Sequence, residues 1–155
     1  VASGPNGVFY VADTGNRRIQ KYHIDTGYLS TWGSAGTGEG QFLRPQALAV
    51  DTQGHVYVAD RDGNRVQIFD KDGNFLDAFG SQGNGDGQFS SPQGIAVDTN
   101  GVVYVSDSSN FRIQKFAPAA AREVETRSGR AHRQGDRTRR KRNERGSSRR
   151  REGAA

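Results

Sequence analysis

The chain has 155 residues, of which 21 are glycine and none is cysteine or methionine, and its formal net charge is +5. The lack of cysteine excludes disulfide bonds, thiol catalysis and zinc–thiolate sites. Residues 1–116 hold 9 Lys and Arg against 12 Asp and Glu, whereas residues 117–155 hold 13 against 5. We therefore expect one folded domain that ends at a boundary near Ala117.

The folded part is a repeat of 47 residues. Tyr10, Tyr57 and Tyr104 follow one another at this interval, and Gly38-Glu39-Gly40-Gln41-Phe42 recurs as Gly85-Asp86-Gly87-Gln88-Phe89. A period of this size fits either a helical array or a four-stranded propeller blade. The glycine content and the short Val, Ile, Tyr and Phe runs favour strands.

The first repeat predicts strands over 8–12, 18–22 and 28–32, which match the second, third and fourth strands of a blade. We expect the first strand of this blade to be missing. A glycine-rich crossing over 33–45 follows and contains Phe42. We expect Phe42 and its copy Phe89 to pack between adjacent blades.

The second repeat predicts strands near 46–50, 55–59, 65–69 and 75–79, and the third predicts 93–97, 102–106 and 112–116. The domain thus divides into a partial blade 1–32, a complete blade 46–79 and a partial blade 93–116. Asp60-x-Asp62-Gly63-Asn64 and Asp70-x-Asp72-Gly73-Asn74 lack the Gly and Glu that a calcium loop requires at its sixth and twelfth positions. Both segments are interpreted as Asp-Gly turns.

These motifs resemble the NHL family of β-propellers. The resemblance covers residues 4–116 and rests on Pro-x-Gly-Ile-Ala-Val-Asp, Val-Tyr-Val-Ala-Asp, Asn-x-Arg-Ile-Gln-Lys-Phe, Phe-Leu-x-x-Phe-Gly and Gly-x-Gly-Gln-Phe. It implies an all-β fold, a partial propeller of four-stranded antiparallel blades. Different relatives use this scaffold for protein binding, RNA binding, sensing and, rarely, lyase chemistry, so the resemblance implies no single function.

Two charged positions recur in every repeat. An Asp closes the second strand and an Arg opens the third, at Asp13 and Arg18, Asp60 and Arg65, and Asp107 and Arg112. Because a catalytic site requires a unique constellation, we interpret these six residues as structural hydrogen-bonding or ion-pairing positions.

Strand order places the loops between the second and third strands on the same face as the crossings. Positions that vary between copies on this face are candidate contacts, because variation on a constant scaffold can encode specificity. Surface drift without function explains the same variation equally well. The candidate binding residues are Arg17, Arg44, Arg61, Asn64 and Phe111.

We predict a non-catalytic binding or scaffold module whose partner is a protein, with no cofactor and no metal. The alternative is RNA binding through the loops or the basic tail, and a lyase-like enzyme is a third reading. His23, His55 and His132 occupy unrelated positions and form no recognisable zinc site. We expect neighbouring blades to be needed for ring closure. The compartment stays open, although the composition favours a microbial cell surface or secretion.

Residues 117–155 do not continue the repeat, and they contain an arginine-rich segment over 137–151. With Val124 as their one large aliphatic residue and no aromatic residue, they are predicted to be disordered. An arginine-rich tail can bind nucleic-acid phosphates, and a solvated end is a further explanation. The abrupt loss of register favours a third, a shift of reading frame in the encoding DNA. Trypsin is expected to remove this tail quickly and leave a core that ends near Lys115.

Overall fold

The computed structural model describes residues 1–118, and Val1–Ala117 form one compact unit. The predictions for the arginine-rich tail therefore lie outside the described residues, apart from its first two positions. Within residues 1–118 no helix is long and apolar enough to cross a membrane.

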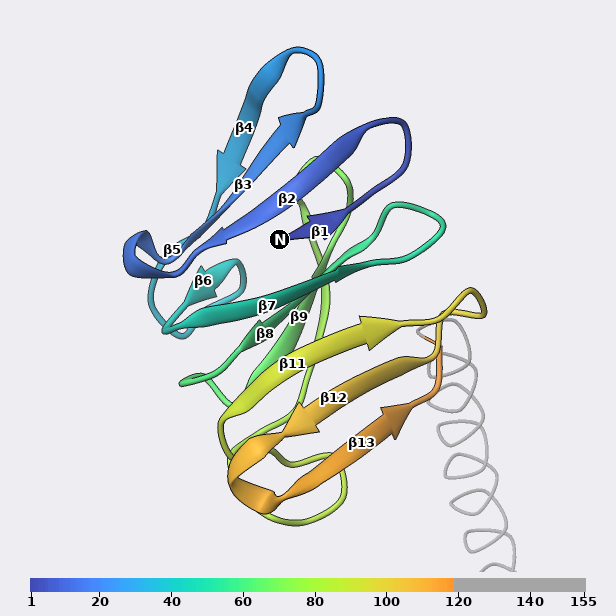
Figure 1. The fold of residues 1–155 in the computed structure, drawn as a ribbon. Coiled ribbons are helices and arrows are strands. Elements are labelled where there is room, and N and C mark those ends of the chain that lie inside the picture. Colours follow the sequence, from blue (N-terminus) through green and yellow to red (C-terminus); the bar gives the residue numbers. More distant parts are fainter. Residues whose placement is uncertain (119–155) are drawn as a thin grey trace, which may run out of the picture. The chain divides into compact units, whose positions relative to one another are not determined.

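Three antiparallel sheets follow one another along the chain (Figure 1). The first contains β1 (Ala2–Ser3), β2 (Val8–Asp13), β3 (Arg18–His23) and β4 (Gly27–Trp32). The second contains β7 (Pro45–Val50), β8 (Val56–Asp60), β9 (Arg65–Phe69) and β10 (Phe75–Phe79). The third contains β11 (Pro92–Val97), β12 (Val103–Asp107) and β13 (Arg112–Phe116). Each of the ten predicted strands is confirmed to within one residue at either end.

The expectation that the first sheet lacks its first strand is wrong. Strand β1 pairs with β2 through Ala2 with Tyr10 and Ser3 with Phe9, in the register that Ala49 and Tyr57 show one repeat later. Two residues of backbone suffice for this pairing. The short segment was missed because two residues show no alternation of apolar and polar side chains.

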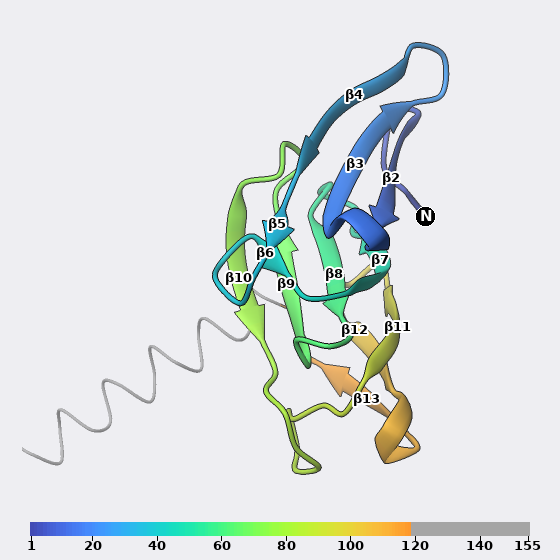
Figure 2. The same ribbon diagram turned by 90° about the vertical axis from the view of Figure 1, so that its left-hand side faces the viewer.

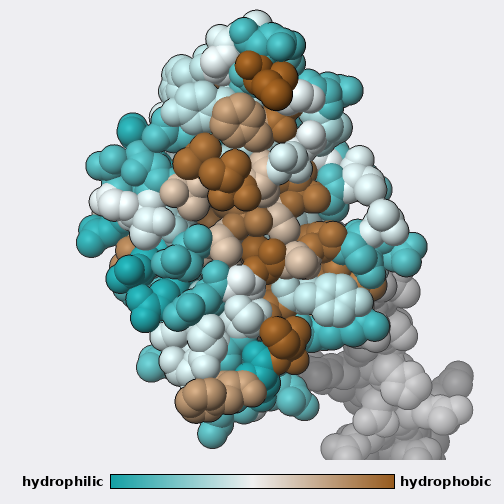
Figure 3. Space-filling view, in the orientation of Figure 1, coloured by the Kyte–Doolittle hydropathy of each residue, from teal (hydrophilic) through white to brown (hydrophobic). Residues whose placement is uncertain are grey.

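The sheets lie beside one another, with β7 next to β2 on one side and next to β11 on the other. Within the second sheet the strands run in the order β7, β8, β9, β10 from the inner edge to the outer edge (Figure 2). Apolar side chains gather along the middle of the view that shows the inner strands, with polar side chains on both sides (Figure 3). This is the stacking of propeller blades, in which each sheet is covered by its neighbours.

Phenylalanines from the crossings fill the spaces between the sheets. Phe42 is fully buried with Tyr10 and Ile19 of the first sheet and Val58 and Phe69 of the second. Phe89 is likewise fully buried, with residues of the second and third sheets around it. The prediction that both rings pack between adjacent blades is confirmed.

Each crossing folds back on itself before it delivers its phenylalanine. The strands β5 (Ser34–Ala35) and β6 (Gln41–Phe42) pair in parallel, and Gln82 forms the matching bridge with Phe89 in the second crossing. Gly33 has φ +103°, and a Cβ on it would lie 2.7 Å from the ring of Phe42. Glycine is therefore required where the crossing begins.

Candidate functional site

The candidate site is the loop face, which consists of the connections 14–17, 61–64 and 108–111 together with the crossings 33–44 and 80–91. The first and last connections contain the short turns η1 (Thr14–Asn16) and η2 (Ser108–Asn110). The first connection and the first crossing lie on the left-hand side of the molecule in Figure 1, and the second crossing runs along its lower end. The left-hand side faces the viewer in Figure 2.

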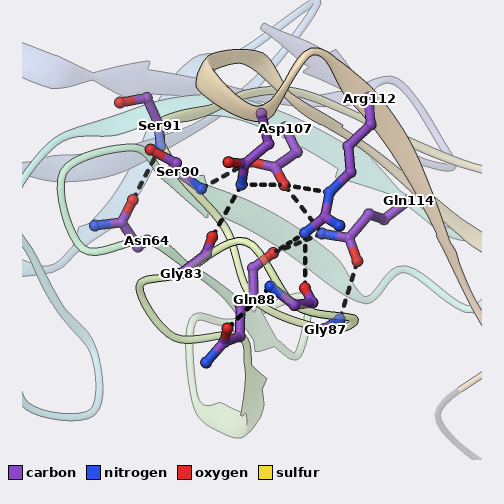
Figure 4. Close-up of polar contacts among 11 residues, drawn as sticks. Asn64, Gly83, Gly87, Gln88, Ser90, Ser91, Asp107, Arg112 and Gln114 are labelled. Carbon is purple, nitrogen blue, oxygen red and sulfur yellow. Dashed lines mark hydrogen bonds and ion pairs between the residues drawn. The ribbon is translucent and has the colours of Figure 1, made fainter.

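In the second and third sheets, a buried carboxylate anchors the connection to the crossing beside it. In the third sheet the Asp107 carboxylate accepts the backbone N–H of Ser90 at 2.7 Å, the Asn110 amide at 2.8 Å and Nε of Arg112 at 2.8 Å (Figure 4). Asp107 is fully buried, and a buried charge is stable only when such partners surround it. The three contacts therefore hold the η2 turn, the crossing and β13 together.

The pKa of Asp107 reflects this environment. Burial raises the pKa of its carboxyl, but the hydrogen bonds from Ser90, Asn110 and Arg112 outweigh burial, and the pKa lies below its ordinary value. The carboxylate is thus the ionised, hydrogen-bond-accepting form at neutral pH.

Two further side chains bind the backbone of the crossing. Arg112 donates from Nη2 to the carbonyls of Gly85 at 2.7 Å and Gln88 at 3.0 Å. Gln114 donates to the Gln88 carbonyl at 2.6 Å and accepts the N–H of Gly87 at 2.9 Å (Figure 4). The crossing is therefore recognised through its main chain, which explains why Arg and Gln recur at these positions.

The second sheet repeats this network with one difference. The Asp60 carboxylate accepts the backbone N–H groups of Leu43 at 3.2 Å and Arg44 at 2.7 Å. Nε of Arg65 stands 3.6 Å from Asp60, and it has no hydrogen bond within residues 1–118. Gly63 occupies the position of Asn110, so the carboxylate lacks that amide and binds two N–H groups of the crossing.

The candidate residues Arg17, Asn64 and Phe111 occupy equivalent positions directly before β3, β9 and β13. All three adopt left-handed backbone, with φ of 54°, 51° and 54°. Asparagine tolerates this conformation, whereas a larger side chain adopts it at a cost in free energy. Phe111 is nevertheless 95% exposed, so burial of its ring does not offset that cost.

Asn64 differs from the other two because its side chain is used inside the fold. Its Oδ1 accepts the backbone N–H of Ser91 at 2.9 Å and so connects the second loop to the second crossing. This contact was not foreseen from the sequence, since only the variability of positions 64 and 91 was visible there. Asn64 is therefore a poor candidate for contact with a ligand.

Arg44 and Arg61 come together at the centre of the loop face. The backbone N–H of Arg61 donates to the carbonyl of Arg44 at 2.9 Å. Arg44 is exposed, and the Arg61 side chain, which is 30% exposed, lies 3.8 Å from Asp62. Nε of Arg61 is buried and has no hydrogen-bond partner within residues 1–118.

Hydrogen bonds join the loops and crossings into one continuous surface. The hydroxyl of Thr14 donates to the carbonyl of Pro45 at 2.7 Å, and the N–H of Ser109 donates to the carbonyl of Ser90 at 3.0 Å. Together with the contacts of Arg61 and Asn64, they connect all three loops through the crossings. The structure thus brings the candidate residues onto one surface, as the strand order predicts.

The other turns are separate from this surface. The Asp70 carboxylate accepts the N–H groups of Asp72 at 2.9 Å and Asn74 at 3.0 Å, as an aspartate-stabilised turn does. Within residues 1–118 no group of three or more His, Cys, Asp or Glu side chains is placed to hold a metal ion.

The stacked antiparallel sheets, two of four strands and one of three, define residues 1–118 as part of a propeller-type fold. Residues 42–69 and 89–116 each match the family model described as NHL repeat. Both segments therefore carry the NHL repeat that the motifs predict, and no curated protein matches the sequence.

Solved structures share the fold at low identity. They include a Bacteroides thetaiotaomicron protein of unknown function, with 22% identity, a TM-score of 0.58 and coverage of 71% of this chain and 32% of that one. A streptogramin B lyase shows 14% identity, a TM-score of 0.55 and coverage of 75% and 39%. A luciferin-regenerating enzyme shows 18% identity, a TM-score of 0.52 and coverage of 70% of this chain and 36% of that one. The chain thus spans between about a third and two fifths of the length of these proteins.

Proposed function

We propose that the chain is a non-catalytic binding module whose loop face holds a protein partner. The observation that carries this proposal is Phe111, a large apolar ring that is 95% exposed on left-handed backbone. Neither exposure nor this backbone conformation stabilises a phenylalanine, so a contact outside the described residues accounts for it best. Aromatic residues and arginine are the side chains most enriched at the centres of protein interfaces.

The arginines of the loop face extend this argument. Arg17 and Arg44 are exposed, and they lie on loops that the repeated Asp, Arg and Gln contacts hold rigidly. A rigid scaffold lowers the entropy that is lost when such side chains bind. Arg17, Arg44 and Arg61 suit the carboxylates of a partner segment. The Phe111 ring suits an apolar side chain of the same segment.

The experiment is a selection from a random peptide library against immobilised residues 1–155. We expect enriched peptides that combine acidic and apolar residues and that lose about tenfold or more in affinity for Phe111→Ser or Arg44→Ser. Lys71→Ser, on an outer turn away from the loop face, is the matched control. Selected peptides that bind all variants equally would place binding elsewhere and reject the proposal.

A parallel measurement separates proteins from nucleic acids. The arginines of the loop face would also attract phosphates, so binding of a mixed-sequence RNA is measured over a range of salt concentrations. RNA binding that Arg44→Ser weakens would favour the nucleic-acid alternative. RNA binding that persists in Arg44→Ser and disappears on deletion of 117–155 would assign the RNA binding to the tail.

A further inference from the structure

The arginines of residues 1–118 fall into two groups. In one group, Nε of each arginine lies beside the Asp that closes the preceding strand, at 2.7, 3.6 and 2.8 Å. This group consists of Arg18, Arg65 and Arg112. The other group lies on the loop face and consists of Arg17, Arg44 and Arg61. Within residues 1–118 the side chains of Arg17 and Arg44 form no hydrogen bond and no ion pair.

The three arginines of the second group lie on neighbouring segments. The backbone N–H of Arg61 donates to the carbonyl of Arg44 at 2.9 Å. On the other side of Arg44, the carbonyl of Pro45 accepts the hydroxyl of Thr14 at 2.7 Å. Thr14 belongs to the same loop as Arg17, so Arg44 lies between the loops that carry the other two arginines.

The next repeat shows how close positions 17 and 44 are. Their copies are Asn64 and Ser91, which are joined by a hydrogen bond of 2.9 Å from the Ser91 N–H to Oδ1 of Asn64 (Figure 4). The copy of the third position is Ser108, so none of these three copies carries a charge. The cluster of arginines is therefore a property of the first crossing and its two loops, and the repeat does not require it.

Little negative charge offsets this cluster. Within residues 1–118, Asp62 is the one carboxylate that pairs with any of the three guanidinium groups, at 3.8 Å from Nη1 of Arg61. This distance is longer than a hydrogen bond, and the Asp62 side chain is 50% exposed. The carboxylates of Asp13 and Asp60 already accept hydrogen bonds from side chains of the first sheet and from the backbone of the first crossing. The cluster therefore lacks a counter-charge of its own.

A phosphate group matches the cluster better than one carboxylate does. A phosphorylated serine carries a charge of about −1.5 to −2 at pH 7 and has three acceptor oxygens. The planar guanidinium group binds phosphate oxygens in pairs. Leu43, directly before Arg44, is 36% exposed. An aliphatic contact beside the arginines suits a peptide side chain better than a sugar–phosphate backbone.

We propose that Arg17, Arg44 and Arg61 bind the phosphate group of a phosphorylated segment of the protein partner. Each arginine comes from a different segment, so the phosphate connects both loops to the crossing between them. This inference rests on the proposed function and names the chemical class of the group that the loop face recognises.

The test uses residues 1–155 and three fluorescent peptide mixtures, which have random residues on both sides of a fixed phosphoserine, serine or aspartate. In fluorescence polarisation we expect the phosphoserine mixture to bind about tenfold or more tightly than the aspartate mixture. Arg17→Gln and Arg44→Gln should each weaken its binding about tenfold. Lys71→Gln removes the same charge from an outer turn, where the side chain is 72% exposed, and should leave the affinity unchanged. Asp62→Asn should raise the affinity, because its carboxylate repels the phosphate.

Four results would overturn the inference. They are equal binding of the phosphoserine and aspartate mixtures, equal effects of Arg44→Gln and Lys71→Gln, competition by inorganic phosphate at the same concentration as the unlabelled phosphoserine mixture, and displacement of that mixture by a lower concentration of mixed-sequence RNA. The third result would assign the site to free phosphate, and the fourth to a nucleic acid. The selection from unmodified peptides tests the proposed function separately, so the two failures are distinguishable.

Discussion

At the scale of single residues, the carboxylates that close the second strands determine how the loops are held. Asp107 has a lowered pKa despite its burial, because Ser90, Asn110 and Arg112 donate to the charged form. The pKa of Asp13 is also lowered, through the Asn16 amide and Arg18. A depressed folded-state pKa contributes stability above the unfolded value of about 3.9, and this contribution disappears as the pH falls through the folded-state pKa.

We therefore predict that the melting temperature declines as the pH is lowered from about 5 towards 2. Asp107→Asn should reduce the free energy of unfolding at pH 7 by about 1–3 kcal/mol and make the decline shallower, because the amide cannot titrate. Asp86→Asn, at an exposed carboxylate of the crossing, should leave both quantities nearly unchanged. Parallel thermal melts by circular dichroism test this. Identical pH profiles for Asp107→Asn and the unaltered chain would refute the role of Asp107.

The outer strand offers a second test at this scale. Phe79 is half-buried and lies 4.6 Å, between centroids, from Phe116 of the next sheet. Phe79→Ala should cost about 3 kcal/mol or less, the lower values applying if the outer edge relaxes. Leu76→Ala, on the same strand but 49% exposed, should be close to neutral. Urea unfolding of both variants makes the comparison, and equal midpoints would show that the outer strand is not packed against its neighbour.

At the scale of elements, the crossings connect the sheets and also fill the space between them. Gly80 and Gly87 in the second crossing both have positive φ, of +98° and +75°. A Cβ on Gly80 would lie 2.5 Å from the ring of Phe89, whereas a Cβ on Gly87 would meet open space.

We predict that each glycine-to-alanine substitution lowers the free energy of unfolding by about 1 kcal/mol through backbone strain. Gly80→Ala should lose clearly more than Gly87→Ala, since it also displaces the buried phenylalanine. The difference between their unfolding midpoints in urea measures the steric contribution. Equal losses would mean that Phe89 moves aside freely.

The strands were predictable because the 47-residue period carries its own register, and a strand recognised in one copy fixes its equivalents. Strand β1 was not predicted because a strand of two residues is too short to show an alternation of apolar and polar side chains. The pairing of Arg44 with Arg61 and of Asn64 with Ser91 depends on how a crossing lies over a loop, which spacing alone does not encode. Phe111 was recognised as variable, but the sequence did not show that its backbone is left-handed or that the residue is 95% exposed.

At the scale of the whole folded unit, two sheet faces remain without a neighbour in residues 1–118. Ile113 of the third sheet is 68% exposed, whereas its copies Ile19 and Val66 are fully buried. At the other end, Tyr28 is 56% exposed. Repeat proteins with uncovered terminal faces are marginally stable and prone to aggregate.

Head-to-tail association of two copies does not repair these faces. The third sheet has no fourth strand within residues 1–118, and residues 120, 122, 123 and 127 depart from the repeat where Gly73, Phe75, Leu76 and Gly80 define it. A junction between copies would therefore lack the phenylalanine that fills each space between sheets. We therefore predict that the protein forms no closed ring by self-association. Light scattering over a range of protein concentrations tests this, and an oligomer of defined mass would contradict the prediction.

The last prediction supplies the missing neighbour in the same chain. Residue 1 is equivalent to residue 48, so a second copy of residues 1–47 placed before Val1 continues the repeat without a break in register. The added Phe42 should cover Phe9 and Tyr22, and the added crossing should take the free nitrogens of Arg18. We expect a higher melting temperature and less aggregation than in the unaltered chain. With Phe42→Ser in the added copy, the free energy of unfolding of the extended chain should fall by about 3 kcal/mol, because the ring is then absent from the new space between sheets. If both extensions melt together with the unaltered chain, the outer face of the first sheet does not accept a blade.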